Sequence, residues 1–108
     1  MIYEFMRLIL FFDLPVTTKK DRKTYAQFRK YLIIIYRYMM MQYSVYCKIF
    51  ANREAAVKHV ANLEKSVPKK GQIRLLLVTE KQYAKIEIIT GGKSMQETIL
   101  NSDSFIKI

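Results

Sequence analysis

Asp13 is the carboxylate best placed for chemistry in this chain of 108 residues. It follows five apolar residues and precedes Leu14-Pro15, so it lies where a buried strand ends. A carboxylate beside apolar residues needs a cation or hydrogen-bond donors to stabilise its charge. One interpretation is therefore a catalytic ligand for Mg²⁺ in phosphodiester chemistry. The other is a turn residue that caps its own backbone, and position alone favours this second interpretation.

Magnesium-dependent hydrolysis generally needs one or two carboxylates together with substrate phosphates. Asp21 and Glu80 are the other candidates within one chain, but we expect Asp21 to stabilise a helix N-terminus, and Glu80 follows a distant strand. A two-fold dimer offers another arrangement, in which two copies of Asp13 face each other across the axis. Their like charges would then need a shared metal ion or a shared proton. Catalysis would then depend on dimerisation.

The composition excludes most other catalytic sites. A single His and a single Cys rule out a His/Cys zinc site within one chain and a disulfide. Three glycines cannot form a dinucleotide-binding glycine motif or a P-loop. We expect Cys47 to be a buried thiol and His59 a surface residue. The apolar runs are too short for a membrane helix, which favours a soluble, cytoplasmic protein.

The chain is strongly basic, with 19 Lys and Arg against 9 Asp and Glu and a formal net charge of +10. Residues 19 to 53 contain nine of these basic residues and one acid. Solubility does not require charges of one sign, so this stretch indicates phosphate contacts with a nucleic acid. The candidate nucleic-acid-binding residues are Lys19, Lys20, Arg22, Lys23, Arg29, Lys30, Lys69 and Lys70.

The apolar pattern predicts the elements that position these residues. Residues 6–12 are apolar on both alternating faces, which is typical of a central strand. Thr18-x-x-Asp21 then predicts a capping box that opens a helix. Tyr25, Phe28, Leu32 and Ile35 share the core face of this helix. Ile33 and Ile34 point away from it and are candidates for a subunit contact.

Further along the chain, residues 38–50 alternate between apolar and polar but are too long for one straight strand, so we expect a bulge or tight turn near residues 42–44. In this segment, packing is the better interpretation for Tyr43, whereas Tyr46 is a candidate phosphate contact. Asn52 caps a second helix that ends at a turn over residues 68–71. Strands are predicted over residues 73–78, 86–90 and 105–108.

This order of elements predicts an α+β fold with ferredoxin-like βαββαβ topology, an antiparallel sheet with two helices on one face and an additional C-terminal strand. Residues 1–90 form the domain. Residues 91–108 form a C-terminal strand or tail that should be paired with another element, since an exposed terminal strand is hazardous.

Five segments carry a family resemblance that spans roughly residues 3 to 90. They are Met6-Arg-Leu-Ile-Leu-Phe-Phe-Asp-Leu-Pro15, Tyr25-x-x-Phe28-Arg-Lys-x-Leu32, Gln42-Tyr-Ser-Val-Tyr46, Pro68-Lys-Lys-Gly71 and Leu77-Val-Thr-Glu-Lys-Gln82. In this order and spacing they resemble CRISPR-associated protein two, the small subunit of the spacer-acquisition machinery, and most closely its type II branch.

The resemblance implies a ferredoxin-like homodimer with magnesium-dependent endonuclease activity, and the family's metal-binding aspartate falls on Asp13. It also implies assembly with the CRISPR integrase subunit around double-stranded prespacer DNA. In the family the C-terminal strand typically packs on the partner protomer, which implies such a contact for residues 91–108. One departure concerns residues 33–38. The family usually has a glycine-aromatic pair before the second strand, but this chain has no glycine there, so we expect the turn to be built differently.

Three functions follow as hypotheses. The first is a DNA-binding structural subunit that bridges integrase dimers during spacer acquisition, with Mg²⁺-dependent nuclease activity as a second role. The second is a stand-alone metal-dependent endoribonuclease of the toxin–antitoxin type, which would act on RNA. The third is a basic protein that binds DNA without specificity. A small domain with so few catalytic residues favours the first.

Overall fold

The computed structural model describes residues 4–90, and its centre is a four-stranded antiparallel sheet. The sheet order is β2-β3-β1-β4. β1 (Met6–Asp13) is a central strand, as its two apolar faces predict, and it pairs with β3 (Val45–Phe50) and β4 (Gln72–Thr79). β2 (Met39–Gln42) and β4 are the outer strands of the described sheet.

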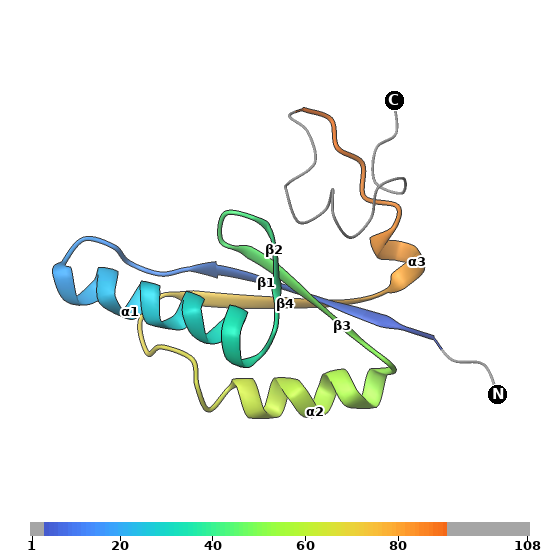
Figure 1. The fold of residues 1–108 in the computed structure, drawn as a ribbon, viewed down its shortest axis with the longest axis horizontal. Coiled ribbons are helices and arrows are strands. Elements are labelled where there is room, and N and C mark those ends of the chain that lie inside the picture. The colour runs from blue at the N-terminus through green and yellow to red at the C-terminus, as the bar shows by residue number, and fades with distance from the viewer. Residues whose placement is uncertain (1–3, 91–108) are drawn as a thin grey trace.

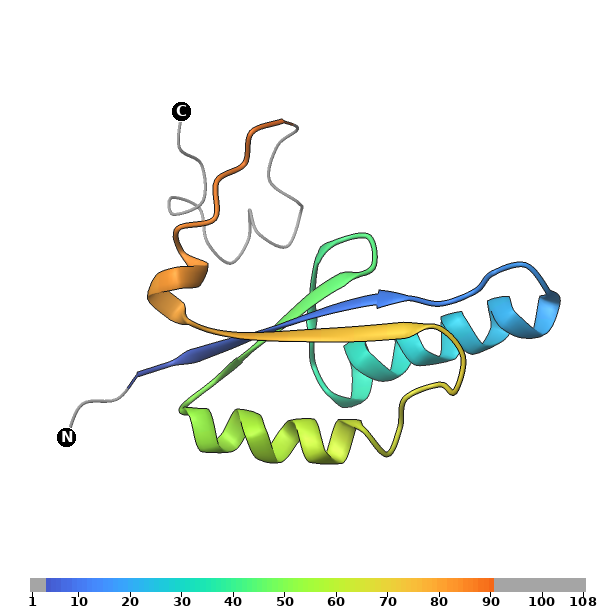
Figure 2. The same ribbon diagram turned by 180° about the vertical axis from the view of Figure 1, so that it is seen from behind.

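Two helices cover one face of this sheet. α1 (Lys19–Lys30) and α2 (Arg53–Leu63) pack on the same side of it, whereas the short α3 (Glu80–Tyr83) lies on the other side (Figures 1 and 2). The βαββαβ order and the antiparallel sheet confirm the predicted α+β, ferredoxin-like fold. We call the side of the sheet opposite α1 and α2 the open face.

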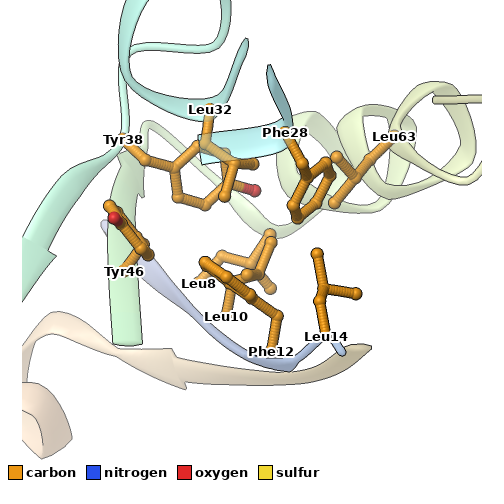
Figure 3. Close-up of a cluster of buried hydrophobic side chains, with 9 residues drawn as sticks. All are labelled: Leu8, Leu10, Phe12, Leu14, Phe28, Leu32, Tyr38, Tyr46 and Leu63. Atoms are coloured by element: carbon orange, nitrogen blue, oxygen red, sulfur yellow. The ribbon is translucent and has the colours of Figure 1, made fainter. Parts of the chain in front are cut away.

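The main core lies between the sheet and the two long helices. Alternate residues of β1 point into it, and Phe28, Leu32 and Leu63 reach them from the helical layer (Figure 3). The buried members of this cluster are Leu8, Leu10, Phe12, Leu14, Phe28, Leu32, Tyr38, Tyr46 and Leu63. Because the period of a strand is two, the intervening residues of β1, including Arg7 and Asp13, belong to the open face.

Both predicted helix starts are confirmed. Asp21 N donates to Thr18 Oγ1 at 3.0 Å and Thr18 N donates to Asp21 Oδ2 at 3.3 Å, which completes the capping box. Asn52 Oδ1 accepts from Ala55 N at 2.8 Å at the start of α2. These contacts satisfy backbone donors that would otherwise lack partners, and they fix where each helix begins.

The end of the first helix differs from the α-helical expectation. α1 continues as a π-helical turn, η1 (Tyr31–Ile35), whose wider period rotates the last residues. Ile33 therefore packs against the core, while Ile35 is 58% exposed, so the predicted outward position of Ile33 and the predicted core position of Ile35 are both wrong. Ile34 is exposed, as expected for a residue pointing away from the core.

The glycine-free turn is built around Arg37. This residue has φ 62°, a left-handed conformation that glycine adopts without strain. The following Tyr38 N donates to Leu32 O at 3.0 Å, and Lys48 Nζ donates to Tyr36 O at 2.5 Å. The expectation of a differently built turn is therefore confirmed: an arginine takes the conformation that would suit a glycine.

The predicted break near residues 42–44 is also confirmed. β2 and β3 form a hairpin with a register shift between Met40 and Gln42, and Ser44 has φ 65° at the tip. A strand over residues 86–90 is wrong, because none of these residues belongs to a strand or a helix. The predicted strand at 105–108 and the tail 91–108 lie outside the described residues.

Candidate nucleic-acid interface

Asp13 is the last residue of β1 and its side chain is exposed on the open face. Its partner in the register is Gln72, the first residue of β4. Within residues 4–90, no hydrogen bond or ion pair to the Asp13 carboxylate is found, so it does not cap the following turn. The carboxylate is free to meet a ligand from solvent.

A groove of about 330 Å³ opens beside Asp13. Its polar lining comes from Asp13 and from Ser44, Gln72 and Arg74, and its apolar lining comes from Phe11, Phe12 and Val45. Phe12 N donates to Ser44 O at 3.1 Å, which ties the hairpin tip to the end of β1. The groove therefore joins three strands, and Arg74 is a lining residue that the sequence analysis did not single out.

The position of Asp13 is fixed by the turn between α2 and β4. Gly71, with φ 89°, packs so closely that a Cβ there would lie 2.5 Å from Asp13 O and 2.7 Å from Leu14 Cδ2. No side chain fits in that space, and the positive φ itself favours glycine. The turn that carries Lys69 and Lys70 is consequently held against the residues that carry the carboxylate.

The other two candidate carboxylates do not join Asp13. Asp21 caps α1, as expected, and Glu80 lies at the opposite end of the sheet, where Thr79 pairs with Met6. No group of three or more His, Cys, Asp or Glu side chains that could hold a metal ion occurs in the described part of the chain. One chain thus offers a single exposed carboxylate at this site.

Glu80 instead neutralises a buried arginine. Arg7 is 7% exposed, and it donates from Nε to Glu80 Oε2 at 3.0 Å and from Nη2 to Glu80 Oε1 at 2.5 Å. Its guanidinium also lies 4.0 Å from the ring centroid of Tyr83. Burial by itself lowers the pKa of Arg7, but the hydrogen bond to Glu80, the interactions with Cys47 and the charge of Glu80 together outweigh burial and raise that pKa above its ordinary value.

All eight predicted nucleic-acid-binding residues are exposed. Two of them also have contacts within the chain. Arg22 donates to the carbonyl oxygens of Val16 and Thr17, and Arg29 Nε donates to Tyr46 Oη at 3.0 Å. The six lysines form no hydrogen bond or ion pair with another residue in the range 4–90. Their charges remain available to an external anion.

Three of these lysines come together at one cleft. It has a volume of about 280 Å³ and lies where the loop after β1, the start of α1 and the turn before β4 meet. Lys20 approaches it from α1, and Lys69 and Lys70 from the turn. The structure thus brings residues 20 and 69–70 together, although some fifty residues separate them in the sequence. Asp21 also lines the cleft but is occupied by the capping box.

Three aromatic or histidine predictions are corrected by the structure. Tyr46 is fully buried and bonded to Arg29, so it cannot reach a phosphate. Tyr43 is 72% exposed rather than packed in the core, although its ring stacks on Tyr25. His59 is half-buried rather than a surface residue, and Tyr38 Oη lies 2.7 Å from its Nε2. The predicted burial of Cys47 is confirmed.

The open face is only partly covered. Tyr83, Ile86 and Ile88 pack over Ile9 and Cys47 at its centre. Towards its margins Phe11, Ile49 and Leu76 remain 38–50% exposed. No helix within residues 4–90 is long and apolar enough to cross a membrane.

Comparisons with known proteins agree with the resemblance. The family model of CRISPR associated protein Cas2 matches residues 6–86. A relative from Treponema denticola is 47% identical over 98 residues, which cover 91% of this chain and 94% of the relative. Relatives from Streptococcus mutans (44% over 99 residues, 92% and 88% covered) and Acidovorax ebreus (42% over 97 residues, 90% and 94% covered) are also similar. All three carry the name CRISPR-associated endoribonuclease Cas2.

Proposed function

The chain belongs to the Cas2 family of CRISPR-associated proteins, and from this membership we propose that it acts in spacer acquisition in the cytoplasm. In this proposal a homodimer binds double-stranded prespacer DNA and bridges dimers of the CRISPR integrase. The observation that carries the proposal is the set of six exposed lysines without partners among the described residues. Lysines of this kind position a duplex through its phosphates and read no base sequence.

The open face supports the homodimer. Its exposed apolar residues on β3 and β4, Ile49 and Leu76, would be removed from water by a second open face. Asp13 lies at the end of the same face, so a two-fold axis that passes near this end would bring two Asp13 carboxylates towards each other. Each chain would then supply half of the acidic site.

The residues of the groove fit magnesium only in part. Asp13 is an exposed oxygen ligand without a described partner, and Ser44 and Gln72 add neutral oxygens nearby. A single carboxylate suits Mg²⁺ when water, substrate phosphate or a second carboxylate completes the shell. Asp13 from two protomers would hold such an ion, which, when bound, activates water and stabilises charge on a phosphate. The chain itself contributes the carboxylate and the basic residues that hold the nucleic acid.

A second function is favoured by the names of the relatives. They are called endoribonucleases, so a magnesium-dependent endoribonuclease that acts alone, as in toxin–antitoxin systems, is the competing proposal. Asp13 would be its catalytic metal ligand. The two proposals differ in whether the integrase is required.

The deciding experiment mixes the protein with its cognate integrase and a double-stranded prespacer. We expect a stable complex and prespacer insertion that needs the small subunit, and we expect Asp13→Ala to retain both. If insertion is lost in Asp13→Ala while assembly and DNA binding persist, the carboxylate is catalytic. If the purified protein alone cleaves RNA with Mg²⁺, and Asp13→Ala abolishes that cleavage without any effect of the integrase, the endoribonuclease proposal replaces ours.

A further inference from the structure

Arg74 stands beside Asp13 on the open face. In the sheet register Asp13 pairs with Gln72 and Phe11 pairs with Arg74. Because residues two apart share a face of a strand, these four side chains form a rectangle, and Asp13 and Arg74 occupy one diagonal of it. All four line the groove described above, and all four are exposed.

The carboxylate and the guanidinium do not neutralise each other. Diagonal neighbours in a sheet are close enough for long side chains to meet, yet Asp13 and Arg74 form no ion pair within 4.0 Å. Arg74 Nη2 instead donates to Gln72 Oε1 at 3.2 Å. This neutral partner uses one of the five donors of a guanidinium, so the others remain available for a ligand.

Arg74 is also an isolated cation in this region. The other arginine on the described strands of the open face, Arg7, is buried and paired with Glu80 at the far end of β1. The neighbours of Arg74 on this face are apolar or neutral, apart from Asp13. An exposed arginine without a carboxylate partner among the described residues, in the groove that also holds Asp13, is suited to bidentate contact with a phosphate.

We propose that Arg74 binds a phosphate of the nucleic acid in the Asp13 groove, with Gln72 as the residue that positions its guanidinium. The inference rests on the proposed function, because it assumes that a nucleic-acid backbone enters this groove and that a dimer contact over Ile49 and Leu76 leaves the groove open. It adds a cationic contact on the open face, separate from the lysines on α1 and the turn before β4. A phosphate held there would lie next to the carboxylate that is the candidate metal ligand.

The test follows the side chain of Arg74 directly. Full-length protein with ¹⁵N-labelled arginine is titrated first with inorganic phosphate and then with a short DNA duplex, both in the presence of a chelator. We expect the Arg74 Nε–Hε resonance to shift saturably in both titrations. Arg53, which is exposed at the start of α2 away from the groove, is the internal control and should not follow the phosphate titration.

Variants then measure how much Arg74 contributes. We expect Arg74→Gln to weaken duplex binding about three- to tenfold and to reduce the salt slope of log K by about one unit, since one phosphate contact is lost. Arg74→Lys should retain part of the affinity, and Arg53→Gln should change it little. Sedimentation of each variant reports whether the oligomeric state is kept.

Two results would overturn the inference. The first is an Arg74→Gln protein that binds the duplex with unchanged affinity and salt slope; this outcome leaves the proposed function intact. The second is an Arg74→Gln protein that loses its oligomeric state, together with a wild-type Arg74 Nε–Hε resonance that does not shift when phosphate is added. This result would make Arg74 a subunit contact. A wild-type protein that binds phosphate at Arg74 but no duplex would support the site and reject the DNA-binding function.

Discussion

Arg7 and Glu80 form a bidentate ion pair that joins the start of β1 to the start of α3. Arg7 is buried, so its charge depends on Glu80 for compensation, and removal of the carboxylate leaves that charge without its partner. The side chain of Glu80 is 33% exposed, which moderates the loss. We expect Glu80→Ala to lower the free energy of unfolding by about 2 kcal/mol.

Urea unfolding followed by circular dichroism measures this change. The matched control is Glu4→Ala, because Glu4 is exposed and forms no ion pair with another residue of the 4–90 range. If the two variants are equally stable, the attraction between Arg7 and Glu80 does no more than offset the free-energy cost of burying their charges.

The turn at Arg37 predicts a stabilising substitution. The left-handed conformation costs a residue with a Cβ roughly 1–2 kcal/mol, and glycine avoids most of this strain. Part of the gain is offset, because glycine has more conformational freedom in the unfolded chain. Arg37→Gly should therefore raise the free energy of unfolding by about 1 kcal/mol. Arg37→Ala is the control, since it removes the same side chain and the same repulsion of Lys48 but keeps the Cβ.

Thermal and urea unfolding compare the two variants with the wild type. A gain in Arg37→Ala equal to that in Arg37→Gly would assign the effect to charge rather than to backbone strain.

The stability of the protein should depend on His59 in mildly acidic solution. Burial first, and the nearby charge of Lys48 second, lower the pKa of His59. The unfolded chain then binds the proton more readily than the folded chain, so stability is full above the unfolded pKa of about 6.5. It falls as the pH drops below that value and levels off below the folded pKa.

The loss reflects a charge placed among aromatic rings. His59 contacts the rings of Tyr36, Tyr38 and Phe50, and Lys48 lies over the Phe50 ring. Urea unfolding at about pH 7.5 and at about pH 5.5 measures the difference. In His59→Gln the difference in the free energy of unfolding between the two pH values should be smaller. If it is the same as in the wild type, the pH dependence comes from the carboxylates instead.

The cleft lysines predict a salt-dependent loss of DNA affinity. The double variant Lys69→Gln/Lys70→Gln removes two charges that have no described partner, so the salt slope of log K for duplex DNA should decrease by about two units. Lys81→Gln/Lys85→Gln is the control, because these exposed lysines lie in and just after α3, on the other side of the sheet (Figure 1). Equal effects of the two pairs would indicate that net charge alone binds DNA.

The sequence predicted the fold well where local signals were strong. The two-sided apolar run of β1, the Thr18 capping box and the Asn52 cap each depend on neighbours within a few residues, and the structure confirms all three. Ile35 was misplaced because a 100° wheel assumes an α-helix, whereas the π-turn has a wider period. The Tyr46 side chain was misread because its partner, Arg29, comes from another element.

The candidate site was predicted only in part for the same reason. Asp13 was identified from its place at the end of an apolar run, which is a local signal. Arg74 was missed because it appears as one charge within an apolar strand, and only the pairing of β1 with β4 places it next to Asp13. The cleft of Lys20 with Lys69 and Lys70 likewise depends on a long-range contact between loops.

The alternation along β1 limits which changes in length this chain can accept. Arg7 and Asp13 are six residues apart, an even number, so both side chains emerge on the open face about 20 Å from each other. A single-residue insertion between them would turn the carboxylate towards the helices and bring a core residue out in its place. Substitutions within this strand can therefore accumulate one at a time, whereas insertions and deletions would be tolerated only in pairs.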